Sequence, residues 1–278
     1  MQDNQSGSRA AAAPAADRPT AWLLDLDGTL YAAGAAIPGA VEMLGRLRQA
    51  GTPFRLVTNT TSRSRAMLVE RLGEYGFTVR PEEIFTATLA GVELLRATGH
   101  GRVAPFLPAP ALKDIVGLEL VGGTSGLSGA GPVDAVVLGD LGERWSYQLL
   151  QEAFERIMAG AALVALSRDR YWLRGERLAL DAGPFVAALE YATGTSATVA
   201  GKPSSAFFAA AVRSLGAGEA GRIAMVGDDL WSDVDGAQRA GLQGWLVRTG
   251  KFREEVLRQS SITPDRIVSS VADLAMYL

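Results

Sequence analysis

The sequence contains no cysteine and a single histidine, His100. The lack of cysteine excludes disulfide bonds, thiol catalysis and every metal site built on thiolates. One histidine also makes histidine-ligated zinc sites and Ser-His-Asp triads poor expectations. Lysine is scarce, since only Lys113, Lys202 and Lys251 stand among 27 basic residues. The chemistry must therefore come from carboxylates, hydroxyls, amides, arginines, these few lysines and the backbone.

Long apolar runs and excess positive charge are missing as well. No stretch approaches the roughly 18 to 20 apolar residues of a membrane helix, so we expect no membrane partner and a cytoplasmic location. The net charge of -3 and the pI of about 5.4 provide no global positive field for nucleic acid. Residues 1–19 are small and polar, with Pro14 inside the alanine run. We therefore predict a disordered tail there rather than a signal peptide.

The remaining composition is that of a globular protein, with 48% hydrophobic and 21% charged residues among 278. Short, wholly apolar segments alternate with amphipathic ones. Strands are expected at 21–26, 54–58, 198–200, 223–227, 244–247 and 266–269, and helices at 38–49, 62–75, 203–215 and 234–240. This alternation indicates a parallel sheet with helices on both faces. We predict an α/β fold whose core is a doubly wound, Rossmann-like parallel sheet.

A second α/β unit is predicted as an insertion in the first. Regions rich in Gly, Pro and Ser separate its expected elements from the core pattern. These elements are strands at 118–121, 135–139 and 162–167 and a helix at 146–158. The predicted domains are therefore a core of residues 20–87 and 184–278, and an inserted domain of residues 88–183.

Two aspartates, Asp25 and Asp27, follow the first expected strand in the run DLDGTL. Ligands of open parallel sheets bind beyond the carboxyl ends of the strands. Residues two apart in near-extended backbone point the same way, and two such carboxylates stay ionised together only with a cation between them. Mg²⁺ prefers oxygen ligands of this kind. The pair predicts a Mg²⁺ site, although a plain turn or cap remains open for so short a motif.

Three further groups of polar residues follow expected strands. Thr58 and Asn59 offer a hydroxyl and an amide to phosphate oxygens, or alternatively cap the next helix. Lys202, in the run GKPS, can offset the charge of a substrate and a nucleophile, or alternatively is a surface lysine before a helix. For each of these two motifs taken alone, the structural alternative is the better explanation. Polar groups recur at the ends of several expected strands, however, and this recurrence favours one shared site.

The richest group is Gly227-Asp228-Asp229 followed by Asp233. Asp228 ends an expected strand and is predicted to complete a Mg²⁺ site with Asp25 and the backbone of Asp27. Asp229 and Asp233 are predicted to orient waters or Lys202 around that site. At least one of these acids is expected to cap the next helix instead.

Together, the runs DLDGTL, Thr58-Asn59, Gly201-Lys202-Pro203 and Gly227-Asp228-Asp229 with Asp233 resemble the four motifs of the haloacid dehalogenase superfamily. The likeness covers residues 21 to 278 and is greatest to subfamily IIA, which carries a large α/β cap between the second and third motifs. The runs Leu180–Phe185 and Val247–Phe252 are similar to those of the phospholysine phosphohistidine inorganic pyrophosphate phosphatases. The spacing agrees, since the 144 positions from Thr58 to Lys202 far exceed one βα unit.

The resemblance implies a Mg²⁺-dependent phosphatase acting through an aspartyl-phosphate. It makes Asp25 the nucleophile, Asp27 the general acid and base, and Thr58, Asn59 and Lys202 the ligands of the phosphoryl group. A small phosphorylated metabolite is the implied partner, bound as a phosphoester, a pyrophosphate or a phosphoamide. The mammalian phosphohistidine phosphatase has a non-acidic residue at the position of Asp27, which weakens the transfer of its phosphoamide substrate to this chain.

We expect the inserted domain to determine which substrate binds. Its candidate specificity residues are Arg168, Asp169, Tyr171 and Trp172. Packing within that domain is an equal explanation for the two aromatic residues. Two other functions remain open: a broad phosphomonoesterase for aryl, sugar or glycolate phosphates, and a catalytically silent phosphate-binding protein. A homodimer through the cap is compatible with the subfamily but is encoded in no motif.

Overall fold

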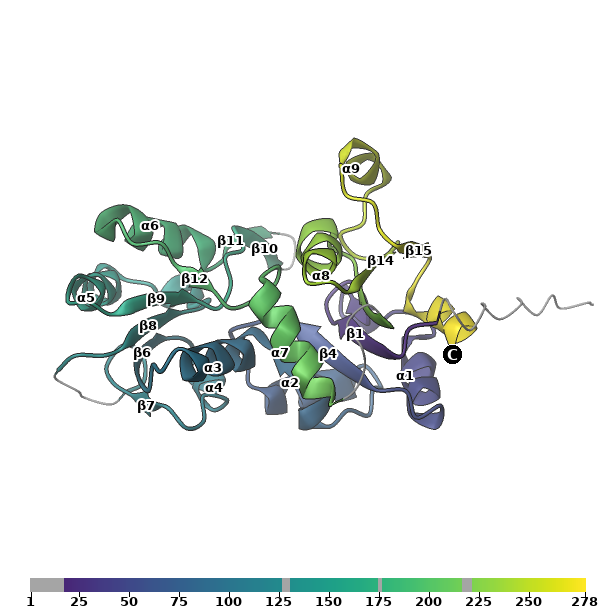
Figure 1. Ribbon diagram of the computed structural model, residues 1–278, viewed down its shortest axis with the longest axis horizontal. Helices are drawn as coiled ribbons and strands as arrows, with labels where there is room; N and C mark the ends of the chain where they lie inside the picture. Colours follow the sequence, from purple (N-terminus) through teal and green to yellow (C-terminus); the bar gives the residue numbers. More distant parts are fainter. Residues whose placement is uncertain (1–17, 127–130, 175–176, 217–221) are drawn as a thin grey trace, which may run out of the picture.

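The computed structural model describes residues 18–126, 131–174, 177–216 and 222–278, which form two α/β lobes side by side (Figure 1). Of the tail that we predict to be disordered, residues 1–17 lie outside this part of the chain. One lobe is built on a six-stranded sheet and the other on a five-stranded sheet. The predicted combination of a core and an inserted α/β unit is confirmed.

The six strands of the core are all parallel, in the order β15-β14-β13-β1-β4-β5. Their bounds are β1 (Ala21–Asp25), β4 (Phe54–Thr58), β5 (Ile84–Thr86), β13 (Ile223–Gly227), β14 (Gln243–Val247) and β15 (Arg266–Val268). Side chains of β1 alternate between two hydrophobic clusters, with Trp22 and Leu24 on one face and Leu23 on the other. Both faces are thus covered, which explains the unbroken apolar strands.

Helices on each face of the core complete these clusters. One face packs against α1 (Ala40–Gln49), α2 (Arg65–Glu74) and the C-terminal 3₁₀ helix Val271–Tyr277. The opposite face packs against α7 (Ser205–Leu215), α8 (Gly236–Arg239) and part of α3 (Ala87–Ala97). The core is therefore doubly wound, as predicted.

The second sheet is also parallel, in the order β12-β9-β8-β6-β7. Its strands are β6 (Arg102–Phe106), β7 (Glu119–Leu120), β8 (Ala135–Leu138), β9 (Ala162–Ala165) and β12 (Thr198–Val199). Helices α5 (Tyr147–Met158) and α6 (Gly183–Thr193) pack on one face, and α3 and α4 (Ala109–Leu112) on the other. We call this inserted lobe the cap. Because α3 packs on both sheets, it joins the two lobes.

Strand β12 lies in a different sheet from the one that the sequence predicts. We expected residues 198–200 in the core, but Thr198 and Val199 pair with Val164 and Ala165 of β9. An apolar pattern identifies a strand without identifying its neighbour, so this placement could not be read from the chain. Helix α6 packs on the cap sheet and β12 pairs with it, although both follow the predicted boundary at residue 183. The exact domain limits stay a prediction.

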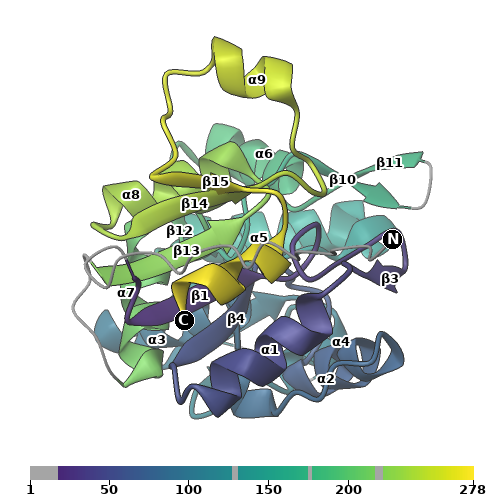
Figure 2. The same cartoon turned by 90° about the vertical axis from the view of Figure 1, so that its right-hand side faces the viewer.

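Two small hairpins and one helix project from this framework. The hairpins are β2 (Tyr31–Ala32) with β3 (Ala35–Ala36), and β10 (Tyr171–Arg174) with β11 (Arg177–Leu180). Figure 2 shows α9 (Glu254–Gln259) standing out from the core beyond β15. Short 3₁₀ turns occupy Pro81–Glu83 and Gly142–Arg144. Among the described residues, no helix is both long enough and apolar enough to cross a membrane.

Candidate active site

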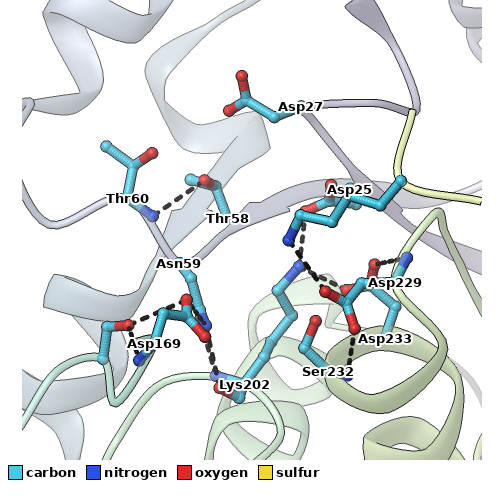
Figure 3. A network of polar contacts seen from close by, with 12 residues as sticks. Asp25, Asp27, Thr58, Asn59, Thr60, Asp169, Lys202, Asp229, Ser232 and Asp233 are labelled. Atoms are coloured by element: carbon cyan, nitrogen blue, oxygen red, sulfur yellow. Dashed lines mark hydrogen bonds and ion pairs between the residues drawn. The ribbon is translucent and has the colours of Figure 1, made fainter. Parts of the chain in front are cut away.

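A buried lysine and two aspartates form the centre of the site (Figure 3). Asp25 is the last residue of β1, and Lys202 lies three residues after β12. The Lys202 ammonium is 2.6 Å from Asp25 Oδ1 and 2.6 Å from Asp233 Oδ1. The three side chains are nearly inaccessible, with 4%, 10% and 1% of their surfaces exposed respectively. The structure therefore joins residues that are far apart in the sequence in one ion-paired group.

Asp228 extends this group from the neighbouring strand. It follows β13, which pairs with β1, so both strands deliver a carboxylate to the same edge of the sheet. Ligand atoms of Asp25, Asp228 and Asp233 all lie within 4.8 Å of one another. We compared groups of acidic and histidine side chains among the described residues. These three aspartates are the group whose ligand atoms lie close enough together to share one metal ion. Asp233 thus joins the two carboxylates that we predicted as ligands.

Burial governs the ionisation of this cluster. It raises the pKa of Asp25 to about 6, although Lys202 acts in the opposite direction. Burial and then the charge of Asp233 raise the pKa of Asp228 to about 7, and burial raises the pKa of Asp233 to about 7 against the pull of Lys202. Burial disfavours the charge of Lys202, but Asp233 and Asp25 hold its pKa above the ordinary value. Full ionisation of the three acids at neutral pH therefore calls for a further cation.

The sequence left open which of Asp229 and Asp233 caps the next helix and which contacts Lys202. Asp229 caps the following helical turn, accepting the N–H groups of Trp231 at 3.1 Å and Ser232 at 3.0 Å. Asp233 lies inside that turn, Leu230–Asp235, which is π-helical, and its Oδ2 accepts the Asp229 N–H at 3.1 Å. The capping acid is thus Asp229, while Asp233 faces Lys202.

Asn59 holds the main chain of Lys202 with both ends of its amide. Its Oδ1 accepts the Lys202 N–H at 2.8 Å and its Nδ2 donates to the Lys202 carbonyl at 2.9 Å. Thr58 is buried at the end of β4, and its hydroxyl accepts the Thr60 N–H at 3.1 Å. Both residues lie near Lys202 (Figure 3), and the Asn59 amide is occupied by contacts with the Lys202 backbone. Their phosphate-binding roles stay predictions.

Asp27 is placed differently from Asp25. It is exposed, its Oδ2 accepts the Tyr31 hydroxyl at 2.9 Å, and its carboxylate points away from Asp25 (Figure 3). The backbone turns sharply after it, because Gly28 has a φ of 84°. The prediction of two parallel carboxylates assumed extended backbone, but the strand ends at Asp25 and the chain bends at Leu26, between the two aspartates. The roles of Asp27 as acid, base and backbone metal ligand stay predictions.

The cap residues predicted to set specificity are dispersed. Asp169 reaches the core, where its Oδ2 accepts the Asn59 amide at 3.3 Å (Figure 3). Arg168 pairs instead with Glu190 at 2.5 Å. Tyr171 and Trp172 lie on the β10 hairpin with 58% and 40% of their surfaces exposed, so packing inside the cap does not account for them. Of the four, Asp169 contacts a predicted site residue.

Sequence reasoning missed Asp181 of the cap and the turn after β14. Burial raises the pKa of Asp181 to about 7, with Asp169 and Asp140 adding to the shift and Lys251 opposing it. Lys251 itself pairs with Asp229 at 2.9 Å. The run Val247–Phe252 carried part of the family resemblance, but no role followed from it. The rule that ligands gather beyond strand ends, applied to β14, would have drawn attention to it.

Comparison with known proteins agrees with this arrangement. A family model described as haloacid dehalogenase-like hydrolase matches residues 22–117, and one described as HAD-hydrolase-like matches residues 199–274. Haloacid dehalogenase-like hydrolase domain-containing protein 2 of Homo sapiens is 44% identical over 84% of this chain and 85% of its own length. Phospholysine phosphohistidine inorganic pyrophosphate phosphatase of Homo sapiens is 37% identical over 90% and 91%.

Solved structures show the same two-lobed fold. A 4-nitrophenylphosphatase from Thermotoga maritima has a TM-score of 0.83 and 27% identity over 95% of this chain and 98% of that one. A glycerol phosphate phosphatase from Mycobacterium tuberculosis, in complex with magnesium, has a TM-score of 0.82 and 32% identity over 95% and 78%. With its parallel core, its inserted parallel cap and relatives at this level of identity, the chain belongs to the haloacid dehalogenase-like hydrolase family, in subfamily IIA.

Proposed function

We propose that this protein is a Mg²⁺-dependent phosphatase that hydrolyses a small phosphorylated substrate through an aspartyl-phosphate on Asp25. One observation carries the proposal: the buried ammonium of Lys202 lies 2.6 Å from both Asp25 and Asp233, beside Asp228. A nucleophilic carboxylate, a fixed cation and two more acids are the groups that phosphoryl transfer requires. The names of the relatives, which include phosphatases of esters and of pyrophosphate, support the same class of reaction.

The acidic cluster fits a divalent cation. Three buried carboxylates and one ammonium would leave a net charge of -2 if all ionised, which burial opposes. We assign the ion to the carboxylates of Asp25, Asp228 and Asp233 and to the backbone carbonyl of Asp27. When bound, Mg²⁺ neutralises charge on the phosphoryl oxygens and orients the group for in-line attack.

The residues of the chain supply the bond-making steps. A carboxylate oxygen of Asp25 bonds to phosphorus while the bond from phosphorus to the leaving group breaks. Asp27 gives its proton to the departing oxygen or nitrogen. Asp27 then takes a proton from the water that attacks the phosphorus, which frees the Asp25 carboxylate and inorganic phosphate. For both transfers, Asp27 must exchange the hydroxyl of Tyr31 for the reacting group.

Lys202 and Thr58 are proposed to bind the remaining phosphoryl oxygens. The Lys202 ammonium already lies against the nucleophile, so it needs no large movement to reach a phosphate bonded there. Fixed charge of this kind supplies much of the barrier reduction in phosphoryl transfer. Asn59 contributes by holding the Lys202 backbone in place.

A substrate panel with and without Mg²⁺ tests the proposal. Purified protein is assayed for phosphate release from pyrophosphate, phosphoramidate, 4-nitrophenyl phosphate, phosphoglycolate and glycerol phosphate, with the Asp25→Asn variant as the matched control. We expect release that EDTA abolishes and added Mg²⁺ restores. Turnover by the Asp25→Asn variant would remove the assigned nucleophile, and activity indifferent to EDTA would remove the metal.

A broad phosphomonoesterase is the second candidate, favoured by structural similarity to 4-nitrophenylphosphatases. The same panel separates it from a specific enzyme, because a broad enzyme turns over several esters at similar kcat/KM. A silent phosphate-binding protein would bind phosphate and release none from any substrate. The cytoplasmic location and the homodimer through the cap remain predictions.

A further inference from the structure

The turn that follows β14, residues 249–251, lies against Asp228 of the acidic cluster. Strand β14 pairs with β13 in the core sheet, so its carboxyl end reaches the edge where Asp228 lies. We call these residues the β14 turn. Neither the predicted site nor the proposed reaction assigns them a role.

Two hydrogen bonds tie the β14 turn to the segments that follow β13 and β1. The backbone N–H of Lys251 donates to Asp228 Oδ2 at 2.7 Å. The hydroxyl of Thr249 donates to the carbonyl of Gly28 at 2.5 Å, in the turn that begins at Asp27. Among the described residues, the Lys251 N–H is the one group that donates a hydrogen bond to the Asp228 carboxylate. The turn therefore fixes one oxygen of Asp228 and leaves the other free for a ligand.

Two glycines make this approach possible. A Cβ on Gly250 would lie 2.0 Å from Asp228 Oδ2 and 2.5 Å from the Gly28 Cα. A Cβ on Gly28 would lie 1.9 Å from the same Asp228 oxygen. Both glycines also have positive φ angles, 58° and 84°. The Asp228 carboxylate is thus held between two backbone segments that only glycine can bring so close.

The side chain of Lys251 adds a weaker, exposed tie. Its ammonium is 2.9 Å from Asp229 Oδ2, but 72% of the side chain is exposed. Exposed ion pairs contribute little to stability. The restraint on Asp228 comes from the backbone of the turn, not from the charge of Lys251.

We infer that the β14 turn is a positioning element that presets the Asp228 carboxylate for the divalent cation, with Gly250 and Thr249 as its key residues. The inference rests on the proposed function, in which Asp228 is a ligand of Mg²⁺. Groups that orient metal ligands commonly change affinity by roughly 10- to 100-fold when altered. A methyl group at position 250 would push the carboxylate out of place, while loss of the Thr249 hydroxyl would free only one anchor.

Calorimetric titration of Mg²⁺ into metal-free protein tests the inference without measuring turnover. The variants are Gly250→Ala, Thr249→Val and, as the matched control, Gly51→Ala. Gly51 has a similar φ of 65°, but a Cβ there would meet no atom within 4 Å. Gly51→Ala therefore carries the same backbone strain without a clash. We expect Gly250→Ala to weaken Mg²⁺ binding at least about 10-fold, Thr249→Val about 3-fold, and Gly51→Ala not at all.

The possible outcomes separate the positioning role of the β14 turn from the proposed function. Wild-type affinity in Gly250→Ala, or equal losses in Gly250→Ala and Gly51→Ala, would overturn the positioning role and leave the proposed function standing. A wild-type protein that binds no Mg²⁺ would overturn the proposed function and the inference together. Should Gly250→Ala fail to fold, the nearly isosteric Thr249→Val decides, and unchanged affinity in it counts against the inference.

Discussion

Replacing Asp228 by asparagine should stabilise the metal-free protein at neutral pH. Burial raises the pKa of Asp228 from 3.8 to about 7. Between these two values the folded protein holds a proton that the unfolded chain has released. Stability therefore falls as the pH rises through this window, since the free energy of unfolding decreases where the folded state binds more protons.

The size of the effect follows from the shift. About three pKa units correspond to ~4 kcal/mol at and above pH 7, and the roughly one unit between 3.8 and pH 5 corresponds to less than half of that. Wild-type protein should therefore lose ~3 kcal/mol between pH 5 and pH 7.5 through this carboxyl group alone. Asparagine carries no such charge and can still accept the Lys251 N–H through its carbonyl oxygen. The variant should lack this decline.

Urea unfolding in EDTA at pH 5 and pH 7.5 measures the difference. Fluorescence reports on the core, because Trp22 and Trp245 are buried there with ring centroids 5.1 Å apart. Comparing Asp228→Asn with wild type at each pH cancels the titrating groups that lie far from Asp228. We expect the variant to be the more stable protein at pH 7.5, with a much smaller gap at pH 5.

Mg²⁺ should remove most of this difference in stability at pH 7.5. A ligand at 100 times its dissociation constant stabilises the folded state by about 2.7 kcal/mol, and the variant should gain far less of this. Two results would refute this reasoning: a variant that is less stable than wild type in EDTA at pH 7.5, or a difference in unfolding free energy that is the same at both pH values. Either would show that burial does not destabilise the ionised Asp228 carboxylate in the absence of a cation.

The remaining predictions concern the reaction. Asp25→Asn should abolish phosphate release while circular dichroism shows an unchanged fold, because asparagine keeps the shape of the side chain but lacks the nucleophilic carboxylate. Asp27→Asn should lower kcat at least ~100-fold, the low end of acid–base effects, and a steady-state assay that finds wild-type kcat would exclude that role. Asn59→Ala should lower kcat by about 10- to 100-fold, because Lys202 loses both amide contacts of its backbone, and unchanged kcat would show that these contacts position nothing.

The sequence was informative wherever local chemistry decides the structure. From apolar runs, the strand at Phe54–Thr58 was predicted with its observed bounds, and β1 was predicted to end one residue later than it does, at Leu26 instead of Asp25. Parallel strands with both faces buried have this signature because helices cover each side. The positions of Asp25, Lys202 and Asp228 around one site followed from the same rule, combined with the resemblance of their motifs to a known family.

What could not be predicted depends on long-range pairing. Lys202 was expected from the core sheet, but it follows β12, a two-residue strand of the cap sheet. Strand β5 and helix α3 were missed because Ile84–Thr86 is only three residues long and runs directly into the helix. The contact between the Lys251 N–H and Asp228 spans 23 positions, and a backbone donor leaves no trace in the side-chain pattern.

The position of Asp233 depends on a feature that no residue pattern encodes. The sequence predicts an α-helix that starts near Val234, yet Leu230–Asp235 is π-helical and α8 starts at Gly236. The wider turn lets both Asp233 and Val234 donate their N–H groups to the Asp229 carbonyl, at 3.0 and 3.3 Å. Such turns are rare and occur often at functional sites. Here the turn places Asp233 against Lys202, where its charge both holds the ammonium next to Asp25 and raises the pKa of Asp228.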